Sequence, residues 1–259
     1  MKLAIFGMFR SGTNFFWWLL SKDSRFKNSY VEPLHPLLLE ERKKYRHYEI
    51  YNSLPELEKY FSPLFAFNNF VMKREESYPE LKAYLDYLIK DDTLIKINRM
   101  PFRINWFMKN FPDVKCVGII RDPRDYAYAH MVNGPWDPIF FNICAKDKRF
   151  MKHFKPLSNE ADAVKLLMFW KACLNEMVES GMPLITIEDL NLVGLDIVEK
   201  LYDNLGFGVT EEVKGAFSDP DSYSYFWGNN LGHGEVSDAV WSEAIRKTNM
   251  EGLINSLGY

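Results

Sequence analysis

Length, composition and charge place this chain among ordinary globular proteins. Its 259 residues are 47% hydrophobic and 26% charged, and no linker divides them, so we expect one domain over residues 1–259. The net charge of −3 excludes a global basic field for nucleic acid, so any anion site must be local. Three widely spaced cysteines and the lack of a long apolar stretch argue against a disulfide framework and a transmembrane segment, and favour a reducing, cytoplasmic compartment.

The first stretch of the chain predicts a phosphate-binding turn. Apolar residues 3–6 are typical of a short buried strand, and residues 15–20 continue with helical length. Between them lies a turn bracketed by Gly7 and Gly12, which have the glycine spacing of a P-loop. A strand, a glycine-bracketed turn and a helix present backbone N–H groups to an anion. The alternative is a glycine turn that only joins a core strand to a core helix.

The residues inside this turn differ from those of a nucleoside triphosphatase. After the second glycine such enzymes carry Lys and then Ser or Thr, whereas this chain carries Thr13 and Asn14. Its cation lies earlier, at Arg10. The turn can therefore hold a phosphate, but it lacks the usual lysine and the hydroxyl that binds Mg²⁺.

A second strand, over residues 27–31, is expected to end at a loop with two prolines. Pro33 and Pro36 prevent further strand pairing. In a parallel sheet, residues just beyond the carboxyl end of a strand face the ligand crevice. Glu32 and His35 are therefore candidates for chemistry, the alternative being a surface carboxylate beside a turn.

Short apolar runs alternate with helical patterns along the rest of the chain. Further strands are predicted over residues 93–97, 114–120 and 184–187, and helices over residues 37–39, 54–61, 81–88, 101–111, 123–131, 160–180, 195–205, 210–217 and from 238 onward. This alternation indicates βαβ units. We expect a three-layer α/β fold, with a central, mostly parallel sheet flanked by helices. Lys96 lies at the end of strand 93–97, where a lysine is usually solvated unless that end faces the crevice.

A second charged junction follows the predicted strand 114–120, which runs directly into an Arg-Asp-Pro-Arg-Asp sequence. Asp122 can cap a helix that Pro123 begins, which fixes Arg121 at a strand-to-helix junction. Arg10 and Arg121 could then hold the two ends of one polyanionic cofactor. The alternative is an arginine paired with a neighbouring aspartate.

Two longer segments are irregular, and the first of them, residues 133–159, is typical of a lid or binding loop. Residues 133–159 are aromatic and locally basic, and Trp136 and Lys146 suggest an acceptor with an apolar body and an anionic part. A solvated run of charges is the alternative. Residues 218–237 are rich in turns and rings.

The two junctions together resemble those of the PAPS-dependent sulfotransferases, which move a sulfuryl group from 3′-phosphoadenylyl sulfate (PAPS) to an acceptor. The run Arg-Ser-Gly-Thr at residues 10–13 is similar to the 5′-phosphosulfate loop of that family, and residues 111–125 resemble its 3′-phosphate motif. There are three weaker similarities. Lys96 followed by Arg99 is similar to the Lys-x-x-Arg strand end of many bacterial members. The other two are the Ile-Glu-Asp-Leu run at 187–190 and the terminal Leu-Gly-Tyr. The resemblance implies the sulfotransferase form of the P-loop NTPase-like fold.

The resemblance also implies roles for single residues. The 5′-phosphosulfate would be held by the loop residues Arg10, Ser11, Gly12, Thr13 and Asn14, and Phe15 would lie against the adenine. Arg121 would bind the 3′-phosphate, with Arg124 of the same motif among the cofactor-binding residues. Lys96 would approach the oxygen that bridges sulfur and phosphorus.

The chain departs from the family at three places. Ala129 stands where a serine is often the second 3′-phosphate ligand, and residues 228–234 carry no Lys or Arg where cytosolic members are basic. Asn98 occupies the position of the catalytic His of cytosolic members. Carbohydrate and protein sulfotransferases resemble one another in using a Glu after the first helix, so Glu32 is the expected base, with His35 second.

The resemblance implies a metal-independent, in-line transfer to a hydroxyl or amine, with PAPS as co-substrate and 3′-phosphoadenosine 5′-phosphate (PAP) as product. The acceptor would be a small molecule, a glycan or a lipid, and the chain could form a homo-oligomer.

Two alternative functions remain. One is a P-loop kinase or NTPase using Mg-ATP, with Glu188 and Asp189 as metal ligands, and the other is a non-catalytic relative that binds a nucleotide or glycan.

Overall fold

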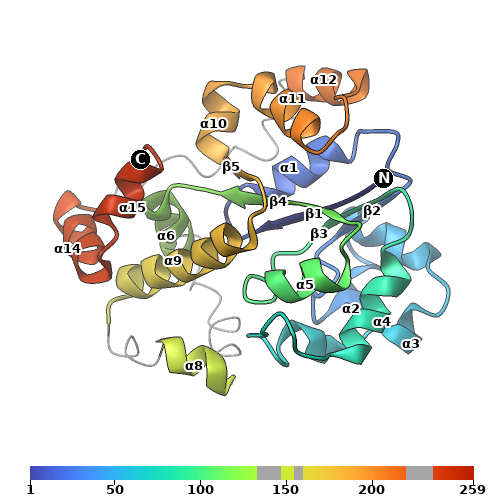
Figure 1. Cartoon of the computed structure of the whole chain (residues 1–259), viewed down its shortest axis with the longest axis horizontal. Coiled ribbons are helices and arrows are strands. Elements are labelled where there is room, and N and C mark those ends of the chain that lie inside the picture. Colours follow the sequence, from blue (N-terminus) through green and yellow to red (C-terminus); the bar gives the residue numbers. More distant parts are fainter. Residues whose placement is uncertain (133–146, 155–159, 220–235) are drawn as a thin grey trace.

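The computed structural model of the chain describes residues 1–132, 147–154, 160–219 and 236–259 (Figure 1). At its centre lies a five-stranded sheet with the order β2-β3-β1-β4-β5, in which every neighbouring pair is parallel. Its strands are β1 (Lys2–Gly7), β2 (Asn28–Val31), β3 (Thr93–Lys96), β4 (Lys115–Ile120) and β5 (Leu184–Thr186). The predicted α/β class with a parallel sheet is therefore confirmed.

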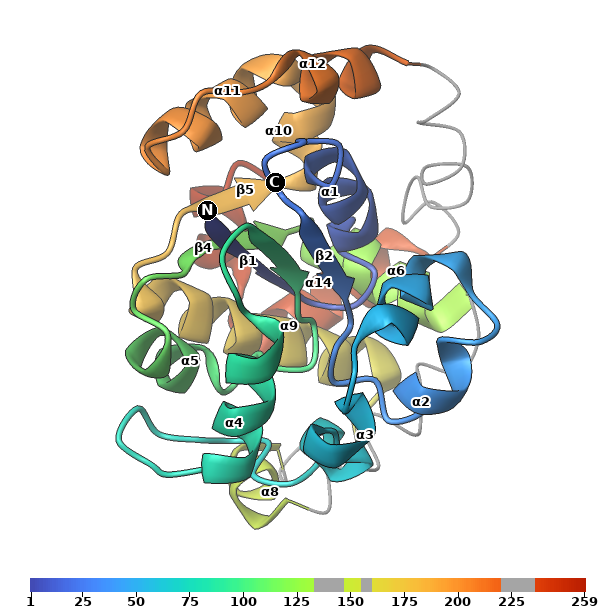
Figure 2. The ribbon, with the colours of Figure 1, turned by 90° about the vertical axis from the view of Figure 1, so that its right-hand side faces the viewer.

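Helices cover both faces of this sheet. They are α1 (Thr13–Leu20), α2 (Leu38–Glu41), η1 (Arg46–Ser53), α3 (Leu57–Tyr60), η2 (Pro63–Ala66), α4 (Pro79–Leu88), α5 (Ile104–Asn110), α6 (Pro123–Val132), α8 (Lys148–Phe154), α9 (Asp162–Ser180), α10 (Ile187–Leu192), α11 (Leu195–Asn204), α12 (Glu211–Ser218), α14 (Asp238–Thr248) and α15 (Glu251–Ser256), of which η1 and η2 are 3₁₀ helices. In Figures 1 and 2, α1, α11 and α12 lie on one side of the sheet and α4, α5 and α9 on the other.

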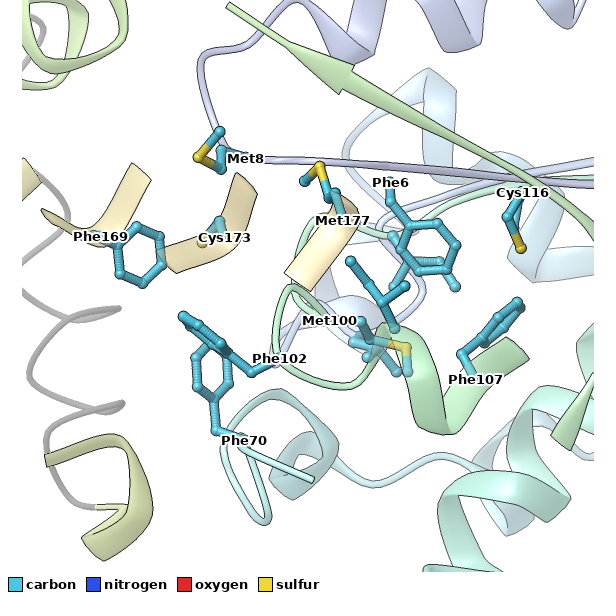
Figure 3. Close-up of a cluster of buried hydrophobic side chains, with 14 of the residues drawn as sticks. Phe6, Met8, Phe70, Met100, Phe102, Phe107, Cys116, Phe169, Cys173 and Met177 are labelled. Carbon is cyan, nitrogen blue, oxygen red and sulfur yellow. The ribbon is translucent and has the colours of Figure 1, made fainter. Parts of the chain in front are cut away.

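The core forms two apolar clusters, one on each face of the sheet. Alternate residues of a strand point to opposite faces, and β1 follows this rule: Leu3 and Ile5 belong to the cluster with α1 and α11, Ala4 and Phe6 to that with α5 and α9. Figure 3 shows the second cluster, in which the rings of Phe6 and Phe107 meet edge to face with centroids 5.2 Å apart. Both faces of the strands are buried, which explains their continuous apolar runs.

The observed elements differ from the predicted ones where hydrogen bonds outside the regular pattern intervene. The helix expected over 101–111 begins only at Ile104, because residues 100–103 form a turn in which the Arg103 N–H donates to the Met100 carbonyl. The strand expected over 184–187 ends at Thr186, whose hydroxyl accepts the N–H of Asp189 at 2.9 Å and caps α10. The helix expected over 54–61 is shortened to Leu57–Tyr60. Residues 46–53, for which no helix was predicted, form η1.

No helix in the described part of the chain combines the length and apolar character that a membrane span requires.

Candidate active site

The carboxyl ends of the strands meet at one edge of the sheet. Val31 and Ile5 both pair with Lys96, and Gly7 pairs with Ile119, so β1 to β4 end nearly level with one another. The segments that follow these strands carry Arg10, Glu32, Asn98 with Arg99, and Arg121. This edge is where parallel α/β sheets bind ligands.

The turn after β1 is built so that only glycine fits at its two ends. A Cβ at Gly7 would lie 2.4 Å from Thr13 Cγ2 and 2.9 Å from the Ile119 carbonyl oxygen. Gly12 has φ +75°, and a Cβ there would lie 2.5 Å from Ile187 Cδ1. The turn therefore packs its backbone directly against β4, α1 and α10.

Two features of this turn suit an anion. Helix α1 begins after Gly12 without a side-chain cap, so in the described part of the chain no capping side chain occupies its first N–H groups. Ser11 is fully buried, and its Oγ has no hydrogen-bond partner among the described residues. Because a buried hydroxyl without a partner is costly, Ser11 is poised to bond a ligand.

Lys96 joins the turn to the predicted base. Its ammonium donates to Glu32 Oε1 at 2.7 Å and to Asn14 Oδ1 at 2.6 Å, and its side chain is 2% exposed. Burial lowers the pKa of Lys96, and the charge of Glu32 opposes that shift. Glu32 Oε2 lies 4.0 Å from Arg99 Nε and has no hydrogen-bond partner in the described part of the chain. One carboxylate oxygen is thus held by the lysine, while the other is left for a ligand.

Arg10 and Glu32 share a strained backbone. Both are non-glycine residues with positive φ, +65° at Arg10 and +48° at Glu32. Such conformations cost about 1–3 kcal/mol each and concentrate at functional sites. The two predicted site residues in the segments that follow β1 and β2 therefore both have a strained backbone.

Asn98 faces the phosphate-binding turn. Its Nδ2 donates to Thr13 Oγ1 at 2.9 Å and to the Met8 carbonyl at 3.5 Å. Because the Thr13 oxygen accepts this bond, its own O–H is directed to another acceptor. Asn98 therefore supports the phosphate-binding turn from the segment that follows β3.

The two cationic junctions lie side by side. Arg121 Nη1 donates to the backbone carbonyl of Arg10 at 3.1 Å, across 111 residues of sequence. Arg121 also lies 3.7 Å from Asp125, as the alternative interpretation expected. The aspartate pairing is therefore observed, whereas a cofactor held between Arg10 and Arg121 stays a prediction.

The peptide group between Arg121 and Asp122 is held at both polar ends. The Trp170 indole N–H donates to the Arg121 carbonyl at 3.0 Å, and the Asp122 N–H donates to Glu188 Oε1 at 2.9 Å. The Tyr259 hydroxyl donates to the other oxygen of Glu188 at 3.0 Å. Three distant segments of the chain thus set the direction in which Arg121 leaves the sheet.

Asp122 caps α6 as predicted, since its Oδ1 accepts the N–H of Arg124 at 2.7 Å. The Arg124 guanidinium returns to the same carboxylate, with Nε 3.0 Å from Oδ1. Arg124 therefore stabilises the cap, and its predicted contact with a cofactor stays a prediction.

Phe15 and His35 are placed differently from the residues above. Phe15 is 2% exposed and stacks on Trp18 inside the core, because position 15 faces inward on α1. It offers no free ring face at the sheet edge, so its expected contact with adenine is not supported. His35 is half-buried, accepts the Leu37 N–H at 3.3 Å and lies beside Tyr48.

Ala129, the departure expected to weaken 3′-phosphate binding, is buried on α6. Trp136, Lys146 and residues 228–234 lie outside the described residues. Within the described ranges, no group of three His, Cys, Asp or Glu side chains is arranged to hold a metal ion.

Sequence reasoning did not assign three contributors: the Thr13 contact of Asn98, the indole of Trp170 and the hydroxyl of Tyr259. The terminal Leu-Gly-Tyr and Asn98 were noted only as points of comparison, and their partners could not be predicted because each contact joins residues at least 49 positions apart.

Comparisons with known proteins add a likeness of fold. A scan against models of protein families finds no match, and neither does a search of curated proteins. Among solved structures, the chain is similar to a sulfotransferase domain from the curacin biosynthetic pathway, with 12% identity and a TM-score of 0.44. The match covers 91% of this chain and 83% of that one. The function of this chain therefore has to be argued from its own site.

Proposed function

We propose that this protein is a sulfotransferase that moves a sulfuryl group from PAPS to a hydroxyl or amine of an acceptor, releasing PAP. The observation that carries the proposal is the 3.1 Å hydrogen bond from Arg121 to the Arg10 carbonyl. This bond links the turn before the uncapped helix α1 to Arg121, which follows β4 at the same edge of the sheet. A nucleotide with a charged group at each end fits such a pair of junctions.

The donor would lie with its phosphosulfate on the turn that Gly7 and Gly12 bracket. Backbone N–H groups at the start of α1, Ser11 Oγ and the Thr13 hydroxyl would donate to its oxygens. Arg121 would take the 3′-phosphate.

The reacting groups would be Glu32 and Lys96. The acceptor proton would pass to Glu32 Oε2 as the acceptor oxygen or nitrogen bonds to sulfur. The bond from sulfur to the bridging oxygen would break at the same time, leaving PAP. An ammonium has three N–H donors, and among the described residues Lys96 donates to two partners, Glu32 and Asn14, so the third N–H would serve that bridging oxygen.

The kinase alternative has less support in the site. Glu188, one of its expected Mg²⁺ ligands, uses one oxygen for the Asp122 N–H and the other for Tyr259. No observation favours it over sulfuryl transfer.

Calorimetry with PAP and with 5′-AMP tests the proposal. We expect PAP to bind at least about tenfold more tightly, and Arg121→Gln to abolish that preference while AMP affinity stays the same. Lys115→Gln, an exposed cation at the opposite end of β4, is the control and should change neither value. Equal affinities for the two nucleotides in the wild type would contradict a 3′-phosphate site. PAP binding without PAPS turnover towards any acceptor would favour the non-catalytic alternative.

A further inference from the structure

The segment that follows α2 carries a short exposed run of cations. Residues 42–53 contain four Lys or Arg and one acidic residue, Glu49. Arg42 is engaged by Glu58 at 2.8 Å, whereas the next five side chains are exposed. We call these five the basic strip: Lys43, Lys44, Tyr45, Arg46 and His47.

The cations of the basic strip are largely uncommitted. Neither Lys43 nor Arg46 forms an ion pair with any residue in the described ranges, and Lys44 has only Glu41 at 3.8 Å. A single exposed ion pair contributes little because both charges stay hydrated and are screened by salt, so an anion that meets several cations at once is bound better than one that meets a single cation.

A series of rings leads from the strip towards Glu32. The Tyr45 and His47 rings stack with centroids 5.7 Å apart, and His47 lies 4.3 Å from Tyr48. Tyr48 in turn lies 6.0 Å from His35, whose backbone N–H donates to the backbone carbonyl of Glu32 at 2.9 Å. The rings therefore run from the exposed cations to the loop that carries Glu32.

The strip is also fixed to the strand that carries Glu32. The Tyr51 hydroxyl of η1 donates to the Val31 carbonyl, the last residue of β2, at 3.0 Å. Burial lowers the pKa of His47, and the charge of Lys96 lowers it further. Burial likewise raises the pKa of Tyr48, and the charge of Glu32 adds to that rise, which agrees with this proximity. Helices α2 and α3, which flank the segment in sequence, lie across the sheet from α11 and α12 (Figures 1 and 2).

We propose that the basic strip binds the acceptor and that the acceptor is an anionic saccharide, with carboxylate or sulfate groups on successive sugars. This inference rests on the proposed sulfuryl transfer, which requires an acceptor hydroxyl or amine. A saccharide supplies hydroxyls, and its ring faces pack on the exposed Tyr45 and His47 rings. Its repeating charges match cations spread over neighbouring residues better than a single small anion does.

The test is calorimetry on the PAP-saturated protein with two probes, a hyaluronan tetrasaccharide that carries uronates and a neutral chitin tetrasaccharide. The variant K43Q/R46Q should weaken hyaluronan binding at least about tenfold and reduce its salt dependence. Tyr45→Ala should weaken both probes. The control K73Q/R74Q replaces an exposed Lys-Arg pair elsewhere and should bind like the wild type.

Several outcomes would overturn the inference: no binding of hyaluronan by the wild type, equal binding of the neutral probe, equal losses in the control, or tighter binding of a single-stranded oligonucleotide or of anionic lipid vesicles. PAP affinity is measured for every variant. If the wild type does not bind PAP, the proposed function is contradicted. If it binds PAP but does not prefer the anionic sugar, only the proposal that the basic strip binds the acceptor is contradicted.

Discussion

Lys96 contacts both the phosphate-binding turn, at Asn14, and the predicted base, Glu32. It is buried, and its charge is compensated by Glu32 Oε1 at 2.7 Å and by Asn14 Oδ1 at 2.6 Å. Taking an ammonium out of water costs several kcal/mol, which the carboxylate offsets only while both partners are present. The pair is therefore a weak source of net stability, but it positions the base and the loop relative to each other.

Removing one partner of this pair should be much worse than removing both. We expect Glu32→Gln or Lys96→Met alone to destabilise the protein by about 3–5 kcal/mol, since each leaves an uncompensated buried charge or donor. The double variant should lose less than either single variant, and therefore much less than the sum of the two. Urea unfolding of the four proteins measures this cycle. Additive losses would mean that the two side chains do not interact in solution.

The same Glu32→Gln change should lower PAPS turnover by about 10² to 10⁴-fold while PAP affinity stays within about threefold. Single-turnover assays beside calorimetry separate the two quantities. Unchanged turnover would assign the base to another group, with His35 the next to replace.

Glu188 should give the stability a recognisable pH dependence. Burial raises its pKa above the ordinary 4.5, although the bonds from Asp122 and Tyr259 oppose the shift. The folded protein then binds this proton more firmly than the unfolded chain, so stability falls as the pH rises from about 4.5 through the folded-state pKa. Glutamine cannot ionise. The Tm of Glu188→Gln relative to the wild type should therefore rise over this interval, and parallel curves would show that the pKa is not raised.

At the scale of elements, the turn between β1 and α1 depends on Gly12. Gly12→Ala should destabilise the protein by about 1–3 kcal/mol and abolish PAP binding, because φ is +75° and a Cβ would meet Ile187 at 2.5 Å. Gly215→Ala on α12, where nothing lies within 4 Å of the added Cβ, should instead stabilise by about 0.5–1 kcal/mol. Thermal denaturation compares the two. A tolerated Gly12→Ala would mean that the turn is not held in this conformation.

The strands were predictable from the sequence because both faces of a parallel sheet are buried, which leaves continuous apolar runs between polar ends. Arg10, Glu32, Lys96 and Arg121 could be assigned to one edge for the same reason, since each follows or ends such a run. The 3₁₀ helix η1 was missed because most of its residues are polar or charged, so no apolar run marks it in the sequence.

The pairings within the site could not be predicted in the same way. Lys96 reaches Glu32 across 64 residues, and Asn98 reaches Thr13 across 85. Which polar side chain faces which depends on strand order and on the rotation of each strand end, and neither leaves a local pattern. The burial of Phe15 could not be predicted either, because which residues of α1 face the core depends on where the helix begins.

At the scale of the whole molecule, one sheet holds both apolar clusters and carries the site at its edge. A nucleotide that bridges the turn after β1 and the junction after β4 ties two central strands together. Its binding energy should therefore add to the stability of the whole fold.

Saturating PAP should accordingly raise the Tm in a single transition. At about 100 times the Kd the gain is about 2.7 kcal/mol, and AMP at the same concentration should give less. Differential scanning calorimetry with and without PAP measures this shift. A second transition that does not respond to PAP would show that part of the chain unfolds independently of the sheet.

The left-handed backbone at Arg10 has a consequence for directed evolution. Its side chain is exposed, and φ of +65° suits glycine or asparagine better than arginine. A library selected for heat resistance alone should enrich those two residues at position 10, whereas one selected for nucleotide capture should keep arginine. The frequency of arginine at position 10 in the two selected libraries would show how much thermal stability the arginine costs and how strongly nucleotide binding requires it.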